Sequence, residues 1–182
     1  FITAAFRRGM IRTTFAARPG RGRVLAAKAI VLGVATFGAG LVASVVAFLV
    51  SQPSLRPLPR TPGLPELSLA DPTVLRAVVG TAVLLALVAV LSLAVATIVR
   101  HTAVAIPLVI LPLLVPSIVS TGLPLSVATW LTRLTPASGF AVQQTIERYD
   151  TAIAPLVGLG VLAAYAAVAL GVATMLLRRR DA

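Results

Sequence analysis

The sequence predicts an all-α, polytopic helical membrane protein, and three observations lead to that prediction. Hydrophobic residues make up 58% of the 182 residues, and the mean hydropathy is +1.01. The apolar residues form four long blocks without charges, whereas a helix at the surface of a soluble protein has one apolar face. The charged residues lie between these blocks or at their ends. We therefore expect four spans in a single transmembrane domain that covers residues 1–182.

The four predicted spans are residues 29–50, 77–99, 102–119 and 154–177. The first has 22 residues, which at about 1.5 Å per residue is enough to cross a hydrocarbon core of about 30 Å. The third contains Pro107, Pro112 and Pro116, so we expect a kinked or partly unwound helix whose freed backbone groups face protein. Pro155 is compatible with the first turn of the fourth span.

The basic residues predict the orientation. Seven of the sixteen Lys and Arg residues lie within residues 1–28, which contain no acid and run directly into the first span. Such a segment stays on the cytoplasmic side of a membrane. This orientation makes residues 51–76 and 120–153 outer loops and residues 178–182 a tail, with both ends of the chain cytoplasmic. It places eleven basic residues inside and five outside. The residues predicted to anchor the chain at the membrane surface are Arg7, Arg21, Arg23, Lys28, Arg178, Arg179 and Arg180.

The two outer loops differ in character. Prolines are frequent between Ser51 and Pro72, so we expect an irregular segment, with Asp71 or Thr73 starting the next helix. The second loop has an apolar run at residues 123–134, too short to span, and a second run at residues 137–149. We interpret these runs as two short re-entrant or interfacial helices, with Trp130 and Tyr149 at headgroup depth. The alternative is a surface loop with two chance helical segments.

Several function classes find no support in the composition. Cysteine is absent, and no phosphate-binding loop, catalytic motif or cluster of metal ligands occurs, so we expect neither an enzyme nor a metal site. The net charge of +11 lies beside apolar segments and not on a polar domain, which argues against nucleic-acid binding. The four blocks contain no Asp, Glu, Lys, Arg or His, although a carrier driven by an ion gradient usually needs one at membrane depth.

Small residues repeat every four positions on two of the predicted spans. Thr36, Gly40 and Ser44 lie on the first, and Ala163, Ala167 and Gly171 on the fourth. Stripes of this kind allow helix backbones to approach closely. We expect them to pack on other helices of the same chain, and contact between two copies is the alternative.

Four stretches, taken in their order along the chain, resemble a known family. They are GMIRTTFAARPGRGRVLAAK (9–28), LADPTVLRAVVG (69–80), VRHTAVAIPLVILPLL (99–114) and LTPASGFAVQQTI (134–146). The sequence is similar to permease subunits of ATP-binding-cassette (ABC) transporters, in the type-2 exporter superfamily common in actinobacteria. The resemblance covers nearly the whole chain. It implies a permease of six spans, of which this chain has the last four; the first residue, Phe1, agrees with an N-terminally incomplete chain.

The resemblance also implies partners and sites. Two permeases, identical or sister chains, would pair and bind two cytosolic ATPase subunits, which hold the ATP and Mg²⁺; this chain itself would need no cofactor. Residues 9–18 would form a coupling helix that contacts the ATPase, and we assign that contact to Met10, Ile11, Arg12, Thr13, Thr14 and Phe15. Re-entrant helices within residues 122–146 would close the exit, with an outer gate at Leu123, Pro124, Trp130, Pro136 and Gly139.

One departure from the family pattern affects the coupling segment. The family often has an acid followed by an aromatic residue just before the glycine of this loop, and here these positions are Ala5 and Phe6. A role for that acid therefore does not transfer to this chain.

The sequence thus predicts an exporter permease in a bacterial cytoplasmic membrane, with an apolar or amphipathic substrate such as a lipid or a drug. A membrane scaffold or regulator that recruits a cytosolic partner through its basic loop is the alternative. A gradient-driven carrier is a third possibility, and it would need an ionisable residue outside this sequence.

Overall fold

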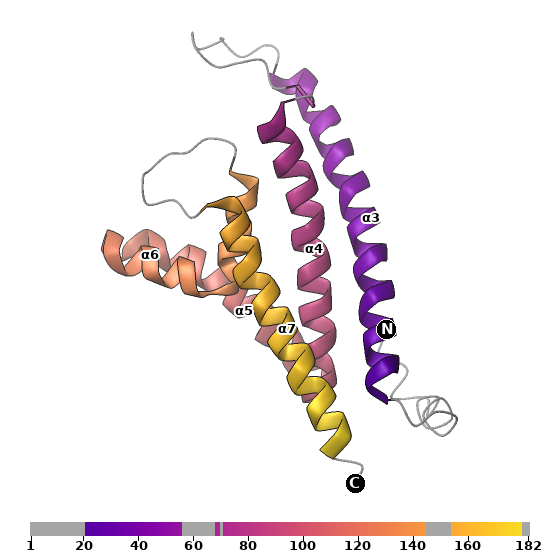
Figure 1. The fold of residues 1–182 in the computed structure, drawn as a ribbon. Helices are drawn as coiled ribbons and strands as arrows, with labels where there is room; N and C mark the ends of the chain where they lie inside the picture. The colour runs from indigo at the N-terminus through magenta and orange to yellow at the C-terminus, as the bar shows by residue number, and fades with distance from the viewer. Residues whose placement is uncertain (1–20, 56–67, 70, 145–153, 180–182) are drawn as a thin grey trace.

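The computed structural model describes residues 21–55, 68–69, 71–144 and 154–179 of the chain. In the part of the chain that the structure describes, four long helices run alternately up and down, and three short helical segments lie between the third and the fourth (Figure 1). The elements are α3 (Arg21–Leu55), α4 (Pro72–Val99), α5 (Thr102–Val119), η1 (Ser120–Gly122), α6 (Leu125–Leu134), η2 (Pro136–Gln143) and α7 (Pro155–Arg179).

All four long helices have the length and apolar composition of membrane spans, and no strand occurs in the part of the chain that the structure describes. The chain is therefore an all-α polytopic membrane protein, as predicted. In a bilayer a helix satisfies its own backbone N–H and C=O groups, which is why uncharged blocks of this length form helices. The short helices α6 and η2, the latter a 3₁₀ helix, occupy the region where two outer helices were predicted.

Helix α3 extends beyond its predicted span at both ends. It begins at Arg21 and not at Ala29, so the last eight residues of the predicted 1–28 loop are helical. The reason is tertiary packing: Leu25 and Ala29 are buried in one cluster with Leu93 of α4 and with Ala173 and Leu177 of α7. At the other end the helix continues through Ser51 to Leu55, into the predicted outer loop.

Helix α3 packs along α4 through small residues. A Cβ added to Gly40 would lie 3.2 Å from Cα of Ala82, and one added to Gly33 would lie 3.4 Å from Cγ2 of Val90. Thr36 and Ser44, which share the predicted stripe with Gly40, are half-buried on the same helix. The opposite face of α3 has no described helix against it and exposes large apolar side chains.

Helix α7 packs through a different face from the one predicted. Its buried residues include Leu162, Ala166, Ala173 and Leu177, which contact α3, α4, α5 and η2 across two apolar clusters. Of the predicted stripe, Ala163 is half-buried, whereas Ala167 and Gly171 are exposed. The prediction of internal packing for this stripe is therefore corrected: the packed face is rotated by about one residue, because large apolar side chains fill the space between these helices.

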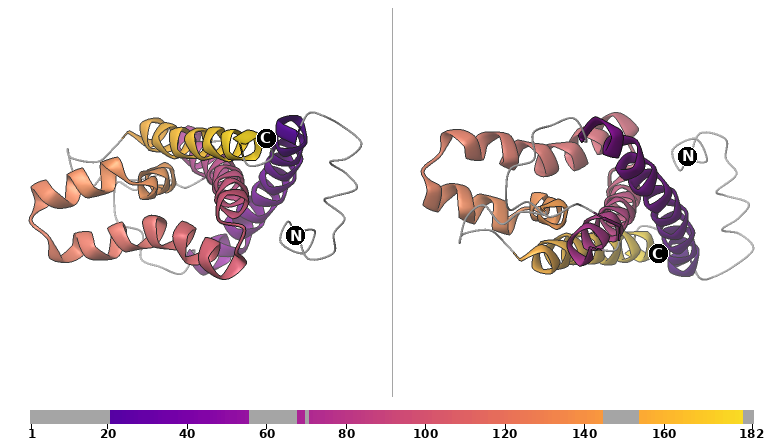
Figure 2. Two further views of the ribbon diagram at one scale, coloured as in Figure 1. Left: turned by 90° about the horizontal axis from the view of Figure 1, so that it is seen from below. Right: turned by 90° about the horizontal axis from the view of Figure 1, so that it is seen from above.

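Helix α5 is unbroken over its eighteen residues, in contrast to the predicted unwinding. The buried residues Ala105, Val109, Leu113 and Pro116 form one stripe against the rest of the bundle. Only Pro116 belongs to this stripe, while Pro112 is half-buried and Pro107 is exposed. Ala103, whose carbonyl loses its helical donor to Pro107, is also exposed, so the prediction that the freed groups face protein is not met there within the described chain. Figure 2, which views the bundle along its length, shows α5 and α6 projecting together from the other helices.

Candidate functional site

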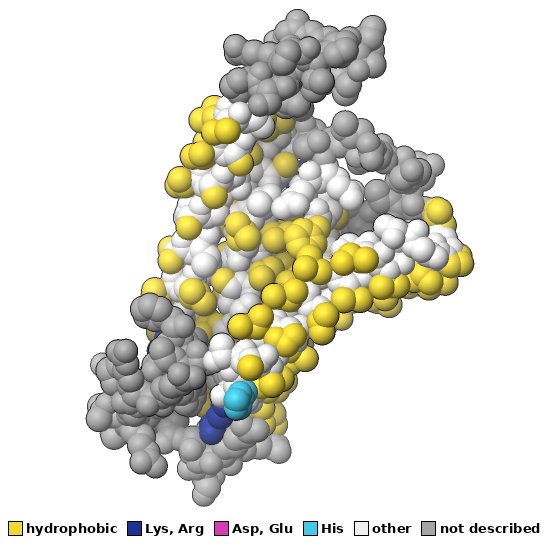
Figure 3. All heavy atoms as spheres, turned by 180° about the vertical axis from the view of Figure 1, so that it is seen from behind, with side chains coloured by type: hydrophobic (Ala, Val, Ile, Leu, Met, Phe, Trp, Pro, Cys, Tyr) yellow, Lys and Arg dark blue, Asp and Glu magenta, His cyan; other side chains and the backbone are white. Residues whose placement is uncertain are grey.

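One end of the bundle gathers basic residues from three separate segments. The start of α3, the turn between α4 and α5 and the end of α7 all lie at this end, which we call the basic end (Figure 1). Arg23, Lys28, Arg100 and His101 are exposed there. Figure 3 shows the imidazole of His101, the one histidine of the chain, beside basic side chains at this end.

The turn at the basic end is short and strained. Only Arg100 and His101 separate α4 from α5. Arg100 has a φ of 58°, in the left-handed region, and its N–H donates to the carbonyl of Ala96 at 3.0 Å. This conformation usually belongs to glycine and costs another residue about 1 kcal/mol. The backbone therefore holds an arginine at a position where glycine would be less strained.

The two groups of residues predicted for this end are only partly within the described chain. The predicted contact residues Met10–Phe15 and the anchors Arg7 and Arg180 lie outside it. Arg21 begins α3, and Arg178 and Arg179 end α7, so their backbones lie at the basic end. The apolar cluster of Leu25, Ala29, Leu93, Ala173 and Leu177 joins α3, α4 and α7 here. The described chain thus begins, at Arg21, on a helix that enters a packed three-helix junction.

At the opposite end, η2 is inserted between α4 and α7 through glycines on both helices. Added Cβ atoms at Gly80 of α4 and Gly158 of α7 would overlap a methyl group of Val142 and the carbonyl oxygen of Ser138, respectively. The Ser138 hydroxyl also donates to the carbonyl of Gly158 at 3.2 Å. Val142 is 1% exposed. The segment η2 is therefore seated against the backbones of two spanning helices.

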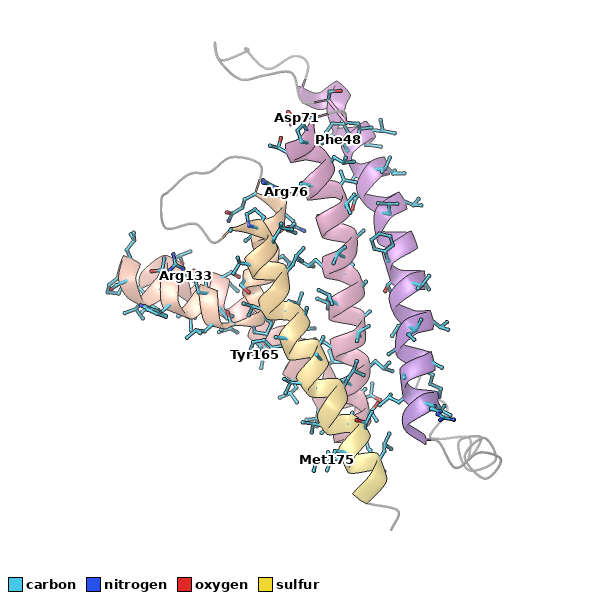
Figure 4. The ribbon with its side chains drawn as sticks, in the orientation of Figure 1. Phe48, Asp71, Arg76, Arg133, Tyr165 and Met175 are labelled. Carbon is cyan, nitrogen blue, oxygen red and sulfur yellow. The ribbon has the colours of Figure 1, made fainter. Side chains whose placement is uncertain are left out.

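Two polar residues lie near the start of α4, and one of them, Arg76, contacts the inserted segment (Figure 4). Arg76 donates from Nη2 to the carbonyl of Gln144, at the end of η2, over 3.2 Å, and its buried Nε has no partner. Asp71 caps α4 by accepting from the Thr73 hydroxyl at 2.6 Å and from the Thr73 amide at 2.9 Å. Both bonds lower the pKa of Asp71, and the bond from the Thr73 hydroxyl contributes more than the bond from the amide. The prediction that Asp71 or Thr73 starts this helix is confirmed, with Asp71 as its cap.

The predicted outer gate divides into two groups that the structure does not bring together. Leu123, Pro124 and Trp130 are exposed, and α6 has no buried residue. Pro136 and Gly139 are buried in η2, and a Cβ added to Gly139 would lie 3.0 Å from Cδ2 of Leu162. Tyr165 of α7 donates a hydrogen bond of 2.8 Å to the carbonyl of Leu134, where α6 ends.

Several serine and threonine hydroxyls within the spans bond back to their own helices. Thr36 bonds to the carbonyl of Leu32, Ser92 to that of Val88 and Thr97 to that of Leu93, each at 2.7 Å. In this arrangement these hydroxyls present no donor to a molecule moving along the helices. No group of three His, Cys, Asp or Glu that could hold a metal ion occurs among the described residues.

Sequence reasoning missed Gly80, Gly158, Ser138 and Tyr165 as positioning residues. The available signal was a glycine inside a span, which costs helix stability of about 1 kcal/mol and therefore suggests close packing. That signal is weak here, because Gly38, Gly160 and Gly171 also lie in spans and have open space beside them.

Comparison of the chain with protein-family models, with curated proteins and with solved structures gives no match.

Proposed function

We propose that this chain is a permease subunit of an ATP-driven ABC exporter in a bacterial cytoplasmic membrane. On this proposal residues Met10–Phe15 contact a cytosolic ATPase subunit, which binds the ATP and Mg²⁺, and a second permease completes the translocation path. The apolar side chains Met10, Ile11 and Phe15 would enter a groove on the ATPase while Arg12 meets acidic residues. The arginines Arg7, Arg21 and Arg23 would instead contact anionic lipid.

The single observation that carries the proposal is the connection between the two ends of the bundle. Helix α4 contributes Leu93 to the cluster at the basic end and Gly80 to the seat of η2. Helix α7 contributes Ala173 to the first and Gly158 to the second. At 1.5 Å per residue these pairs are about 20 Å apart on α4 and about 22 Å apart on α7. On this proposal, a displacement of the basic end would be transmitted to η2 through two continuous helices, α4 and α7.

The described spans favour an apolar or amphipathic substrate. Their four blocks contain no Asp, Glu, Lys, Arg or His, and the hydroxyls of Thr36, Ser92 and Thr97 are bonded to carbonyls of their own helices. A polar solute would lose its hydration without gaining hydrogen bonds along these walls. Closure of the ATPase dimer would tilt α4 and α7 as levers, and the substrate would leave near α6 and η2.

The test is purification of the complete protein from its native membrane in mild detergent, with identification of the proteins that co-purify. A variant with Arg12, Thr13, Thr14 and Phe15 changed to Ala tests the contact. The matched control changes Arg7 and Arg23 to Gln, which removes predicted lipid contacts only. We expect a nucleotide-binding ATPase with the wild type and the control, and its loss with the loop variant.

Two outcomes would contradict the proposal. Recovery of a partner without ATPase activity would favour a scaffold that recruits a cytosolic protein through the same loop. Retention of the ATPase by the loop variant would show that residues 12–15 are not the contact, and the coupling site would then lie elsewhere at the basic end.

A further inference from the structure

Helix α6 has one apolar and one polar side, and neither is buried. Val127, Trp130, Leu131 and Leu134 follow the spacing i, i+3, i+4, i+7, which places them on one face of a helix. Ser126, Thr129 and Arg133 follow a similar spacing on the other side. Trp130 is 64% exposed and Leu134 is 62% exposed. An apolar face of this kind needs a partner that the described chain does not provide.

The length of α5 limits how far α6 can lie from the basic end. Helix α5 has eighteen residues and connects His101 to the segment that leads into α6. At 1.5 Å per residue it spans about 27 Å, and less in the direction of the membrane normal if it is tilted. The hydrocarbon core is about 30 Å thick, and charged groups such as Arg100 stay at its boundary. Helix α6 therefore lies no farther from the basic end than the far edge of the hydrocarbon, and not in the bulk water beyond it.

The orientation of α6 agrees with this depth. The helix lies across the direction of α4 and α7 (Figure 1), and Arg133 lies on the side that faces the end with Asp71 and Arg76 (Figure 4). The opposite side, with Leu131 and Val127, accordingly faces back toward the basic end. The apolar surface continues on α5, where Ile106, Ile110, Leu114 and Ile118 are exposed along the spanning helix. Figure 3 shows a band of hydrophobic side chains that starts beside His101.

We propose that the apolar face of α6 contacts the acyl chains of the leaflet opposite the basic end, with Arg133 at the level of the lipid headgroups. Trp130 then faces lipid and does not line a translocation path, unlike Pro136 and Gly139, which pack inside the protein. Tryptophan is favoured at this level of a bilayer because its ring is apolar and its N–H is polar. This inference does not depend on the transport proposal.

Trp130 is the one tryptophan of the chain, so its fluorescence reports on α6 alone. The experiment uses the 182-residue chain in nanodiscs of phosphatidylcholine and phosphatidylglycerol, with brominated acyl chains as one quencher and aqueous iodide as the other. We expect bromines near the carbonyl end of the chains to reduce the emission more than bromines near the methyl end. We also expect a blue-shifted emission and little quenching by iodide.

A control variant moves the reporter to the other face of the same helix. It combines Trp130→Phe with Thr129→Trp, because Thr129 lies four residues before Arg133 and shares its side, about 100° around the helix from Trp130. This variant is expected to lose sensitivity to brominated chains and to gain sensitivity to iodide.

Two results with the wild type would overturn the inference. Strong quenching by iodide without quenching by brominated lipid would place Trp130 in water. Quenching by neither would show that protein, such as a second copy of the chain, covers this face.

Discussion

Helices α6 and η2 are neighbours in sequence, separated by Thr135, yet they lie in opposite environments. Six of the eight residues of η2 are buried, and its backbone lies against Gly158 of α7. No residue of α6 is buried, and a hydrogen bond from Tyr165 reaches its last carbonyl. The comparison shows that the segment predicted to form one outer gate has two parts in different environments. The second part, η2, is packed within the bundle, and the first part, α6, is attached to it at its end.

The largest loss of stability is expected when a methyl group is added at the contact between η2 and α7. In Gly158→Ala the new methyl group would overlap the carbonyl oxygen of Ser138, which is backbone and cannot rotate away. We expect the free energy of unfolding to fall by about 3 kcal/mol, as in other overpacked cores. Thermal unfolding in detergent measures this change.

The control for this variant is Gly160→Ala, two residues further along α7. Gly160 has open space beside it, so alanine there should be neutral or stabilise the helix by up to about 1 kcal/mol. Equal behaviour of the two variants would mean that η2 does not contact α7 as described.

A smaller effect is expected where η2 meets α4. A methyl group in Gly80→Ala would overlap a methyl of Val142, but that neighbour is a side chain and can be removed. We expect Gly80→Ala to destabilise the protein by about 2 kcal/mol. The double variant Gly80→Ala/Val142→Ala should recover part of that loss in the same thermal assay. A double variant whose loss equals the sum of the two single losses would argue against direct contact.

The attachment of α6 to α7 should weaken when the hydroxyl group of Tyr165 is removed. Tyr165→Phe removes the 2.8 Å hydrogen bond to the carbonyl of Leu134 and leaves the aromatic ring in place. We expect a loss of about 1 kcal/mol. Hydrogen exchange read by mass spectrometry should show faster exchange in α6 and unchanged exchange in η2. Faster exchange in both segments would show that they open together.

The smallest change in stability is expected from the titration of Asp71, which lies at the start of α4 and outside α6 and η2. Its pKa is lowered in the folded chain by the hydroxyl and then the amide of Thr73, so the ionised cap stabilises the helix above the unfolded pKa of about 3.9. That contribution disappears as the pH falls through the lower, folded pKa. Carboxyl NMR of labelled Asp71 should show a pKa below the usual value. The substitution Thr73→Ala removes the hydroxyl donor and should raise the pKa of Asp71 toward that value.

The sequence predicted the spans well because their determinants are local. Long uncharged blocks must form helices in a bilayer, and Pro72 and Pro155 mark the starts of α4 and α7. The start of α3 at Arg21 was missed because it depends on Leu25 packing against Leu93 and Leu177, which are far away in the sequence. Charge alone suggested that the loop continued to Lys28.

The seat of η2 could not be predicted for a similar reason. A glycine in a span marks a possible close approach but not its partner, and Gly80 looks like Gly38 or Gly160 until the fold brings Val142 to it. The packed face of α7 was missed because the stripe of small residues next to it appeared equally suitable. The separation of Trp130 from Gly139 depends on the turn at Thr135, which carries no distinctive signal in the sequence.

The central claim is that η2 is packed against α7, whereas α6 is attached to α7 through a hydrogen bond at its last residue, and one cross-linking measurement tests it directly. A Cβ at Gly139 would lie 3.4 Å from Cβ of Leu162, close to the separation of about 3.8 Å in disulfides. The chain has no cysteine, so Gly139→Cys/Leu162→Cys creates a single pair, and Trp130→Cys/Leu162→Cys is the matched pair from α6. Linked peptides are identified by mass spectrometry after mild oxidation in native membranes. Rapid and complete linkage of the first pair, with free thiols in the second, is the result that we predict. Free thiols in the first pair, or equal linkage in both, would contradict the claim.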